Sequence, residues 1–413
     1  MTPISACRIC GNTHLVTVLS LGEQALTGVF PRSPEEPVTR GPLELVKCHG
    51  GSACSLLQLA HSYDSSEMYG ANYGYRSGLN QSMVAHLRAK VEHLQELTSI
   101  RSDDVVLDIG SNDGTLLSCY AVGPILVGID PTAAKFRQFY QSRIKVIPDF
   151  FSSGLFRAEF GERKAKVITS IAMLYDLESP ISFVEQIASI LAEDGIWHFE
   201  QSYMPSMLAV DAYDTVCHEH VEYYGLKQIQ WMLDRCGMKI LDVEINDVNG
   251  GSFAVTAALA TSALEPNRAT VQSILDAETA ASLETLAPYE AFARRVAKHR
   301  DDLLSKLAEI AASGATILGY GASTKGNVIL QYCGLTPNEI PAIAEVNPDK
   351  FGAFTPGTKI PIISEAEAHK RKPDYFLVMP WHFRENLIAR EKAFLEAGGK
   401  MLFPLPRIEI VSR

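Results

Sequence analysis

The sequence predicts an α/β protein with three parts: a small N-terminal module (residues 1–70), a central Rossmann-like domain (71–260) and a C-terminal Rossmann-like α/β domain (261–413). Two observations support this prediction. Four of the eight cysteines lie near the N-terminus, and strand-like runs alternate with helical stretches in two separate regions of the chain. A chain of 413 residues also exceeds one ordinary hydrophobic core, so several domains are expected.

The composition excludes several classes of protein. With 46% hydrophobic and 21% charged residues, the chain has the composition of a folded globular protein. The net charge of -11 opposes binding to a phosphate backbone, so no nucleic-acid partner is expected. No apolar run approaches the ~20 residues that span a bilayer, and the N-terminus lacks a charged segment followed by an apolar one. We therefore expect a cytoplasmic protein without a membrane partner, as a monomer or weak homodimer.

The N-terminal cysteines predict a metal site, because clustered thiols in a reducing compartment favour a metal over a disulfide. Cys7 and Cys10 have the CxxC spacing that lets two thiolates share one tetrahedral ion. Cys48 and Cys54 are separated by five residues, which is longer than usual, and His49 could replace one of them. We expect a structural zinc, because four protein ligands leave no open position for catalysis. The alternative is a degenerate, empty site.

Residues 1–70 alternate strand-like runs with glycine and proline, as a small β-rich module would. Residues 82–100 predict an amphipathic helix. Its apolar residues recur at three- and four-residue steps, at Val84, Leu87, Val91, Leu94 and Leu97. Five apolar runs then predict a parallel sheet wrapped by helices, with strands at 105–110, 125–130, 145–147, 166–173 and 195–202.

The pattern changes near residue 260. A long helical region at about 265–312 carries one apolar stripe, formed by Phe292, Val296, Leu303, Leu307 and Ile310. A second α/β region follows, with strands expected within 315–323, 341–346 and 375–380.

The strongest local signal is the turn after the first central strand. That strand ends in Asp108 and leads through the sequence GSNDG (110–114) into a helix, and glycines there let the backbone approach a ligand closely. Dinucleotide enzymes use GxGxxG to seat a pyrophosphate. Here the carboxylates of Asp108 and Asp113 would repel one, and they suit a cationic ligand with an amino group. We therefore expect S-adenosylmethionine (SAM), with S-adenosylhomocysteine as product. A degraded NAD site and a helix start without a ligand are the alternatives.

Further SAM contacts are expected where the neighbouring strands end. Asp130 ends the second strand, twenty residues after Gly110, where a carboxylate can accept both ribose hydroxyls. Asp149 follows the third strand, and Phe150 and Phe151 could flank an adenine. The predicted SAM-binding residues are Asp108, Gly110, Asn112, Asp113, Gly114, Asp130, Asp149, Phe150 and Ser170.

Polar and aromatic residues are dense in segments 73–77, 170–175 and 214–224, with Glu200 and Gln201 ending the fifth strand. Ligands of open α/β sheets bind beyond the strand C-termini, so the strand-end residues should face one crevice. On an extended segment His218 and His220 would share a face, with Glu219 opposite, and histidine is a natural general base near neutral pH. Alternatively, the two histidines bind a metal or make hydrogen bonds within the fold.

The whole chain resembles the SAM-dependent sugar C-methyltransferases that make branched-chain deoxysugars, typified by the NDP-hexose 3-C-methyltransferases. The resemblance rests on the N-terminal cysteines, segment 73–77, DIGSNDGTLL, CHEHVEYY, the NGGS at 249–252, and the C-terminal GYGASTKGN and PDYFLVMPWHF. It implies a zinc module, a central class I methyltransferase domain that binds SAM, and a C-terminal Rossmann-like domain. The implied substrate is a nucleoside-diphosphate 4-keto-6-deoxy sugar lying between the last two domains.

The resemblance also implies roles for single residues. His220, in the trio with His218 and Glu219, matches the proposed base of the family, and Tyr73 or Tyr75 matches its active-site tyrosine. The chain departs from many members in having Cys217 before this trio, and from several in having Tyr175 after the fourth strand. The implied reaction is removal of the acidic C3 proton beside the C4 ketone by His220. Tyr75 or another donor stabilises the enolate oxygen, and C3 then accepts the methyl group.

The turn GYGASTKGN (319–327) follows a strand and could cradle a phosphate, with a lysine as point charge. By itself it could be a second dinucleotide site or a vestigial turn. The resemblance implies instead that it holds the diphosphate of the sugar nucleotide. Asn347 and His382 are weaker candidates for the same cleft. The predicted substrate-binding residues are Arg76, Ser77, Tyr175, Glu200, Gln201, Tyr224, Asn249, Ser323, Lys325, Asn327 and Trp381.

Two other functions fit the sequence. One is a SAM-dependent methyltransferase acting on a different activated ketone or hydroxyl, because the fold alone does not decide the substrate. The other is a zinc-stabilised binding protein with an inert SAM fold. The intact acids of the glycine turn and the trio at 218–220 favour an enzyme over this second reading.

Overall fold

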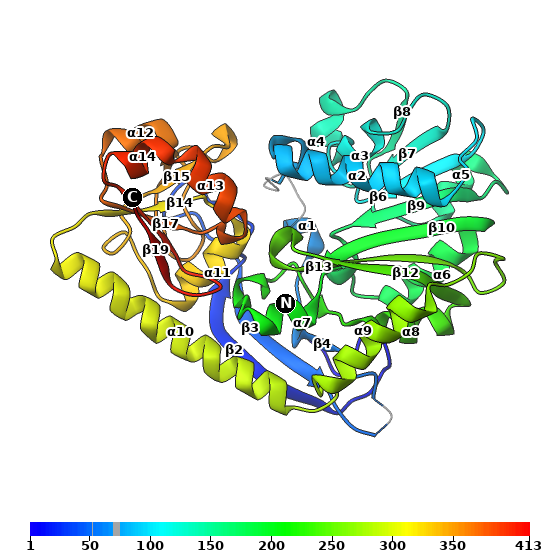
Figure 1. Ribbon diagram of the computed structural model, residues 1–413, viewed down its shortest axis with the longest axis horizontal. Coiled ribbons are helices and arrows are strands. Elements are labelled where there is room, and N and C mark those ends of the chain that lie inside the picture. Colours follow the sequence, from blue (N-terminus) through cyan, green and yellow to red (C-terminus); the bar gives the residue numbers. More distant parts are fainter. Residues whose placement is uncertain (52, 69–74) are drawn as a thin grey trace.

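The computed structural model of the chain describes residues 1–51, 53–68 and 75–413. Figure 1 shows two lobes, with the central α/β domain on the right and the C-terminal α/β region on the left. Strands β2 (Leu15–Ala25) and β3 (Arg40–Cys48) lie between the lobes, and the long helix α10 (Ala287–Ala312) runs along the lower side of the C-terminal lobe.

The central sheet has the strand order β12-β13-β10-β9-β6-β7-β8. The five strands β6 to β10 pair in parallel. Strands β13 and β12 extend the sheet at the β10 edge in antiparallel pairs. The five strands predicted from apolar runs are confirmed, and the two antiparallel strands were not predicted. The strands are β6 (Val105–Ile109), β7 (Ile125–Ile129), β8 (Ile144–Ile147), β9 (Ala165–Ile171), β10 (Leu191–Ser202), β12 (Met238–Asn246) and β13 (Ser252–Leu259).

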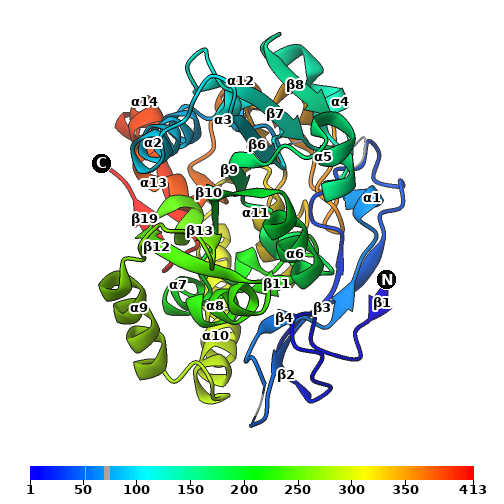
Figure 2. The same ribbon diagram turned by 90° about the vertical axis from the view of Figure 1, so that its right-hand side faces the viewer.

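Helices cover both faces of this sheet, and Figure 2 shows α2 (Gln81–Leu97) and α6 (Pro180–Ile190) on opposite sides of it. The Asn80 side chain caps the start of α2 by accepting a hydrogen bond from the Ser82 amide. The predicted helix is confirmed, but its buried stripe begins at Met83 instead of Val84, and Leu97 is 41% exposed. The other helices, with η denoting 3-10 turns, are η1 (Ser77–Leu79), α3 (Thr115–Ser118), α4 (Ala133–Phe136), η2 (Arg137–Phe139), α5 (Ser153–Phe160), η3 (Leu174–Asp176), α7 (Met204–Ala209), η4 (Tyr213–Thr215), α8 (Leu226–Arg235) and η5 (Val248–Gly250).

The N-terminal module contains a four-stranded antiparallel sheet in the order β11-β4-β3-β2 and a small pair, β1 with β5. Strand β11 (Glu222–Tyr223) comes from the central part of the chain, directly after the segment that carries His220. The predicted β-rich character is confirmed, and the sheet joins two parts that the sequence analysis separates. The remaining elements are β1 (Thr2–Pro3), β4 (Leu57–Leu59), β5 (His61–Ser62) and α1 (Ser65–Met68).

The C-terminal sheet has the order β16-β15-β14-β17-β18-β19, parallel except for β19. The three predicted strands correspond to β14, β15 and β17. The predicted long helical region forms two helices, α9 (Arg268–Ala280) and α10, with Ser282 at a φ of 55° between them. The other elements are β14 (Ile317–Tyr320), α11 (Thr324–Tyr332), β15 (Ile343–Glu345), η6 (Pro348–Lys350), β16 (Ile362–Ser364), α12 (Glu365–Lys370), β17 (Tyr375–Val378), η7 (Trp381–Phe383), α13 (Arg384–Arg390), α14 (Lys392–Glu396), β18 (Lys400–Phe403) and β19 (Glu409–Val411).

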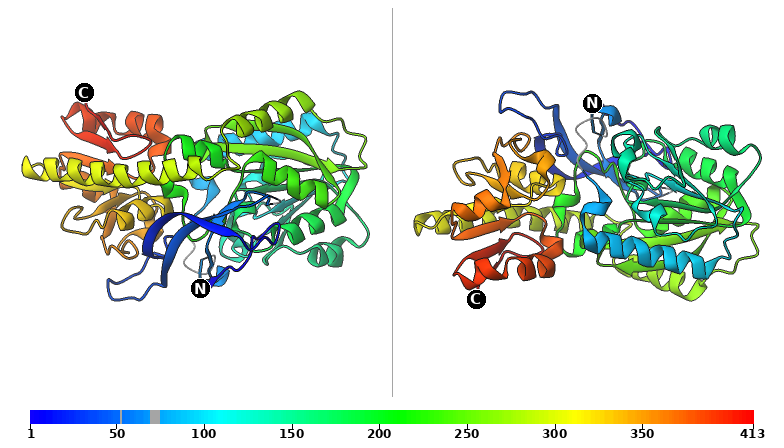
Figure 3. Two further views of the ribbon diagram at one scale, coloured as in Figure 1. Left: turned by 90° about the horizontal axis from the view of Figure 1, so that it is seen from below. Right: turned by 90° about the horizontal axis from the view of Figure 1, so that it is seen from above.

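One hydrophobic cluster extends from the N-terminal sheet through α10 into the C-terminal sheet. The whole predicted stripe of α10 is buried, and Figure 3 shows this helix beside β2. The buried Lys47 of β3 places its ammonium 4.7 Å from the ring centre of Tyr289 on α10, and it donates a hydrogen bond to the Ser55 carbonyl. The C-terminal lobe is therefore packed against the N-terminal sheet, while the division at residues 70 and 260 stays a prediction.

Within the described residues, none of the helices combines the length and the apolar character that crossing a membrane requires.

Candidate active site

A cavity of about 420 Å³ lies between the carboxyl edge of the central sheet, the start of α2 and the N-terminal end of α11. This volume is within the range of small-molecule sites, roughly 300–1,000 Å³. Most of the predicted site residues meet here. Those that line the cavity are Tyr75, Arg76, Ser77, Asp108, Gly110, Asn112, Tyr175, Glu200, Gln201, Glu219, His220, Asn249, Ser323 and Lys325, together with the weaker candidates Asn347 and His382.

Other predicted residues do not line the cavity. Some of them hold neighbouring parts of the fold instead, as described below, and Tyr73 lies outside the described residues. The predicted residues outside the lining are Asp113, Gly114, Asp130, Asp149, Phe150, Ser170, His218, Tyr224, Asn327 and Trp381.

The glycine turn after β6 requires an unusual backbone. Gly110 and Gly114 both have a φ of 74° and Asn112 has a φ of 50°, in the left-handed region that glycine and asparagine tolerate best. A Cβ on Gly114 would also lie 2.6 Å from a ring carbon of Tyr140. The two glycines therefore permit this backbone, and Gly110 and Asn112 line the cavity beside Asp108, where a ligand can approach the chain closely.

Asp108 is buried beneath this turn and accepts a 2.6 Å hydrogen bond from the Thr169 hydroxyl. Burial raises the pKa of Asp108 to about 7, against the effect of the Thr169 hydrogen bond. A positive group placed beside this carboxylate would favour its ionised form. The observation fits a ligand that carries an amino group, as SAM does.

Asp113 binds the protein chain instead of facing the cavity. Its carboxylate accepts hydrogen bonds from the Gly78 amide at 2.9 Å and from the Thr115 hydroxyl at 2.5 Å, and Arg76 lies 3.9 Å away. The Asn112 side chain accepts from the Ser77 amide at 3.0 Å and donates to the Tyr75 carbonyl. The glycine turn thus holds the segment that places Tyr75, Arg76 and Ser77 on the cavity wall.

Asp130 is also occupied by its own surroundings. Its carboxylate accepts from the Asn112 amide at 2.8 Å and from the amide and hydroxyl of Thr132 at 2.6 and 2.5 Å. The expected contact of Asp130 with the ribose hydroxyls stays a prediction. It would use the carboxylate lone pair that these three hydrogen bonds leave. The Ser170 hydroxyl accepts a hydrogen bond from the indole of Trp197, and Asp149 and Phe150 are exposed.

The segment carrying the two histidines is a turn, because the His220 amide donates to the Cys217 carbonyl at 3.1 Å. The expectation of an extended segment with both histidines on one face is wrong. The turn directs Glu219 and His220 into the cavity, while the His218 ring packs edge-on against Tyr63 of the N-terminal module, with centroids 4.6 Å apart.

His220 has a defined tautomer. Its Nδ1 lies 2.9 Å from the Thr215 carbonyl, which can only accept, so Nδ1 carries the proton and Nε2 keeps a lone pair. The Tyr175 ring packs on the imidazole with centroids 4.2 Å apart. Burial, together with the charge of Lys325, lowers the pKa of His220 to about 3. The imidazole is therefore neutral near pH 7, with a lone pair on Nε2.

Glu219 is held by the N-terminal module. The Thr27 hydroxyl donates to its carboxylate at 3.2 Å, and a Cβ on Gly28 would lie 2.2 Å from its Oε1. Only glycine leaves room for the carboxylate at that position. Burial raises the pKa of Glu219 above its ordinary value.

Glu200, at the end of β10, has three partners: His86 Nε2 at 2.6 Å, Lys90 Nζ at 3.0 Å and the Asn246 amide at 2.8 Å. Burial alone would raise the pKa of Glu200, but the hydrogen bond from His86 and the charge of Lys90 lower it to about 2. Glu200 is therefore ionised and paired with the Lys90 ammonium at this wall of the cavity.

The C-terminal lobe contributes the first turn of α11. The Ser323 hydroxyl caps the helix by accepting from the Gly326 amide, and Lys325 Nζ donates to the Asn249 carbonyl at 2.8 Å. The buried Asp214 is the nearby counter-charge of Lys325 and accepts a 2.8 Å hydrogen bond from the Trp381 indole. The structure thus brings Asn249 and Lys325 together and places Trp381 behind them.

Two more predicted substrate residues face the protein interior. The Asn327 amide donates to the Thr27 carbonyl at 2.7 Å, and the Tyr224 hydroxyl donates to Glu222 at 2.8 Å. Four cavity-lining residues were not predicted: Gly28 and Phe30 of the N-terminal module, Glu345 at the end of β15, and Lys350 of η6. Glu345 could have been found as an acid ending a strand, like Asp130, but no sequence signal marks Gly28 and Phe30.

The four N-terminal cysteines form one cluster, with their sulfur atoms all within 4.8 Å of one another. Cys7 and Cys54 are 3.5 Å apart, as are Cys10 and Cys48, and all four are free thiols. These distances fit a tetrahedral zinc with Zn–S bonds of about 2.3 Å, whose sulfurs lie roughly 3.8 Å apart. The Asn12 amide adds a 3.3 Å hydrogen bond to the Cys48 sulfur. Cys54 completes the set, while the His49 ring packs against His14.

Models of protein families match three consecutive parts of the chain. A "Putative zinc binding domain" matches residues 7–69, a "Methyltransferase domain" matches 83–243, and a "C-methyltransferase C-terminal domain" matches 247–406.

The chain is 30% identical over 419 residues to the C-methyltransferase NovU of Streptomyces niveus, covering 99% of this chain and 97% of that protein. Among solved structures, the mitomycin 7-O-methyltransferase MmcR is similar at 13% identity and a TM-score of 0.34, over 44% of this chain and 55% of that one. The CcbJ methyltransferase of Streptomyces caelestis is similar at 11% identity and a TM-score of 0.33, over 42% and 89%.

The cysteine cluster predicts a difference between two neighbouring variants. Cys54→Ser should lose zinc and unfold at a lower temperature, because a hydroxyl is a far poorer zinc ligand than a thiolate. His49→Ala should retain one zinc per chain, because the four sulfurs form the site without it. Metal analysis of the purified variants, with thermal unfolding, tests both. Zinc loss in His49→Ala and retention in Cys54→Ser would contradict the assignment.

Proposed function

The chain belongs to the C-methyltransferase family that includes NovU, and we propose that its acceptor is a nucleoside-diphosphate 4-keto-6-deoxy sugar. In this proposal the enzyme transfers a methyl group from SAM to C3 of the sugar. The observation that carries the proposal is that one cavity is shared by the three parts of the site. It joins the glycine turn, the His220 side chain and the first turn of α11 in one volume. A donor, a base and an anion site are the three things this reaction needs.

When bound, SAM supplies an electrophilic methyl group on a sulfonium. We assign its binding to the turn around Gly110, with Asp108 as the buried carboxylate for its positive charge. Asn112 fixes the segment of Tyr75 and Ser77 over the turn, so this segment can cover the bound ligand and limit access of water.

His220 acts as the base in this proposal. A C4 ketone acidifies the C3–H bond, and Nε2 accepts that proton while the bonding electron pair moves toward the C4 oxygen. The new C3–CH₃ bond then forms as the methyl–sulfur bond breaks. The Thr215 carbonyl, which holds Nδ1–H, stabilises the imidazolium that forms, and a positioned base typically contributes ~10²–10⁴-fold.

The enolate oxygen requires a hydrogen-bond donor or a positive charge. Tyr75 lines the cavity and is the donor we propose.

The first turn of α11 is the proposed diphosphate site. Ser323 and Lys325 line the cavity at the positive end of the helix dipole, and Lys350 adds a second ammonium from the C-terminal lobe. In this structure the Lys325 ammonium donates a hydrogen bond to the Asn249 carbonyl. A phosphate oxygen of the substrate would replace that carbonyl as acceptor or share the ammonium with it.

The base assignment predicts the behaviour of two histidine variants. His220→Asn should bind SAM normally but lose both methyl transfer and exchange of the C3 proton with deuterated solvent. His218→Asn should retain exchange, because His218 lies outside the cavity against Tyr63. Isothermal titration with SAM and NMR of a 4-keto-6-deoxy sugar nucleotide in D₂O measure these properties. Near-normal exchange in His220→Asn would remove this residue from the base role.

The diphosphate assignment predicts a selective effect on substrate binding. Lys325→Ala should raise KM for the nucleotide sugar by about 10-fold or more, because a hydrogen bond to a charged group is worth ~1.5–3 kcal/mol. The affinity for SAM should be unchanged. Lys359→Ala, at a lysine outside the cavity lining, is the control. Steady-state kinetics in which Lys325→Ala keeps the KM of the unmodified enzyme would rule out the role.

A further inference from the structure

Arg8 lies between the zinc ligands Cys7 and Cys10, in the middle of the CxxC knuckle. Its side chain is only 3% exposed, which is rare for arginine unless its donors are paired. No motif in the sequence assigns this residue a role, and it is not among the residues that line the cavity. Its burial therefore requires an explanation within the fold.

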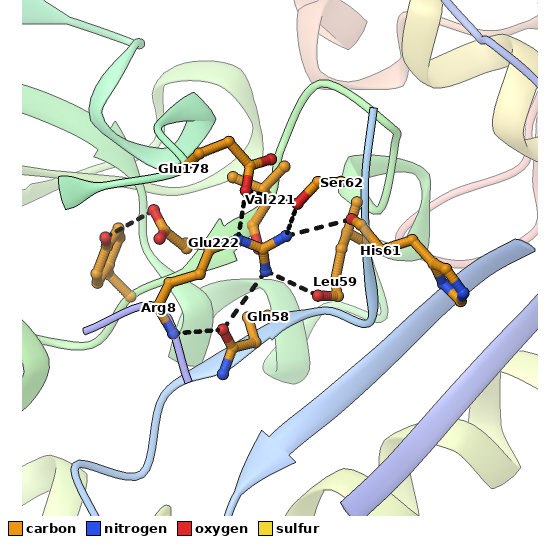
Figure 4. Close-up of polar contacts among 9 residues, drawn as sticks. Arg8, Gln58, Leu59, His61, Ser62, Glu178, Val221 and Glu222 are labelled. Atoms are coloured by element: carbon orange, nitrogen blue, oxygen red, sulfur yellow. Dashed lines mark hydrogen bonds and ion pairs between the residues drawn. The ribbon is translucent and has the colours of Figure 1, made fainter. Parts of the chain in front are cut away.

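The guanidinium of Arg8 joins three segments that are distant in sequence (Figure 4). It donates to the Leu59 carbonyl at 2.8 Å, the His61 carbonyl at 3.2 Å and the Ser62 hydroxyl at 3.0 Å, all in the N-terminal module. It also pairs with the Glu178 carboxylate at 3.2 Å and approaches the Val221 carbonyl at 3.5 Å.

The last two contacts lie beside the proposed catalytic group. Val221 directly follows His220, and its carbonyl also accepts from the Leu59 amide at 2.9 Å. The Val221 amide donates to the carbonyl of Tyr175, whose ring packs on the His220 imidazole. Glu178 follows Tyr175 by three residues. Arg8 therefore contacts both segments that enclose the imidazole.

The same module holds the other side of the turn. Thr27 donates to the Glu219 carboxylate, and the Asn327 amide of α11 donates to the Thr27 carbonyl. Contacts from the N-terminal module thus reach the residues immediately before and immediately after His220. A packing role limited to the zinc knuckle would need neither contact.

We propose that Arg8 is a positioning residue, which transmits the rigidity of the zinc knuckle to the turn of Glu219 and His220 and to the Tyr175 segment. The proposal rests on the proposed role of His220 as base. Arginine suits this task because its planar guanidinium offers five donors in a fixed arrangement, and Arg8 directs them to carbonyl, hydroxyl and carboxylate groups at once. Lysine has three donors on one nitrogen and cannot span the same groups.

The test uses the full-length enzyme with the variants Arg8→Lys and Glu178→Gln. Arg8→Lys should keep one zinc per chain and its SAM affinity, while kcat falls about 10- to 100-fold with little change in KM, because small misplacements of a catalytic group cost that much. Glu178→Gln removes only the ion pair and should lower kcat less, in the same direction. Arg143→Lys is the matched control, because Arg143 also donates to two backbone carbonyls, far from the cavity.

A second readout needs no substrate. In ¹⁵N NMR of the imidazoles, the His220 signal, assigned with His220→Asn, should shift or broaden in Arg8→Lys and stay unchanged in Arg143→Lys. Wild-type kcat and an unchanged His220 signal in Arg8→Lys would overturn the proposal. If Arg8→Lys does not fold, an unchanged kcat and imidazole signal in Glu178→Gln would overturn it equally.

The two proposals can fail separately in this experiment. Absence of proton exchange in the unmodified enzyme would refute the proposed reaction, while the imidazole signal would still report whether Arg8 positions His220.

Discussion

The hydrogen bond between His220 Nδ1 and the Thr215 carbonyl decides which chemistry the cavity can support. It assigns the ring proton to Nδ1 and leaves Nε2 as an acceptor in a buried site. The bond forms because the segment after Cys217 turns back on itself, so that the ring of His220 meets a backbone carbonyl five residues earlier. Without this turn the imidazole would have neither a defined tautomer nor a defined direction. The N-terminal sheet, the Tyr175 ring and α11 all contribute to holding it.

Charge is distributed unevenly around this imidazole. Asp108 is buried under the glycine turn, and this burial raises its pKa. On the opposite side Lys325 lies near the buried Asp214, and burial together with the charge of Lys325 lowers the pKa of His220. One end of the cavity thus favours a cationic ligand, and the other has an ammonium available for an anion. A sulfonium donor and a diphosphate-bearing acceptor would place complementary charges at the two ends, with the base between them.

The sequence was sufficient for the features that depend on local pattern. The parallel strands, the amphipathic helices, the glycine turn after Asp108 and the cysteine cluster all follow from periodicity or spacing, and the structure contains each of them. Features that depend on long-range contacts were missed or wrong. The turn at His218 directly precedes β11, which pairs with the distant strand β4, and Asp113 and Asp130 bind backbone amides that no sequence pattern reveals. Gly28 reaches the cavity only because the N-terminal module packs against both lobes.

A crystal structure of the enzyme with S-adenosylhomocysteine and a 4-keto sugar nucleotide would test the central claim most directly. The account predicts the adenosyl ligand in the turn at Asp108 and Gly110, with Nε2 of His220 facing the carbon that receives the methyl group. A ligand bound elsewhere, or an imidazole directed away from that carbon, would contradict it.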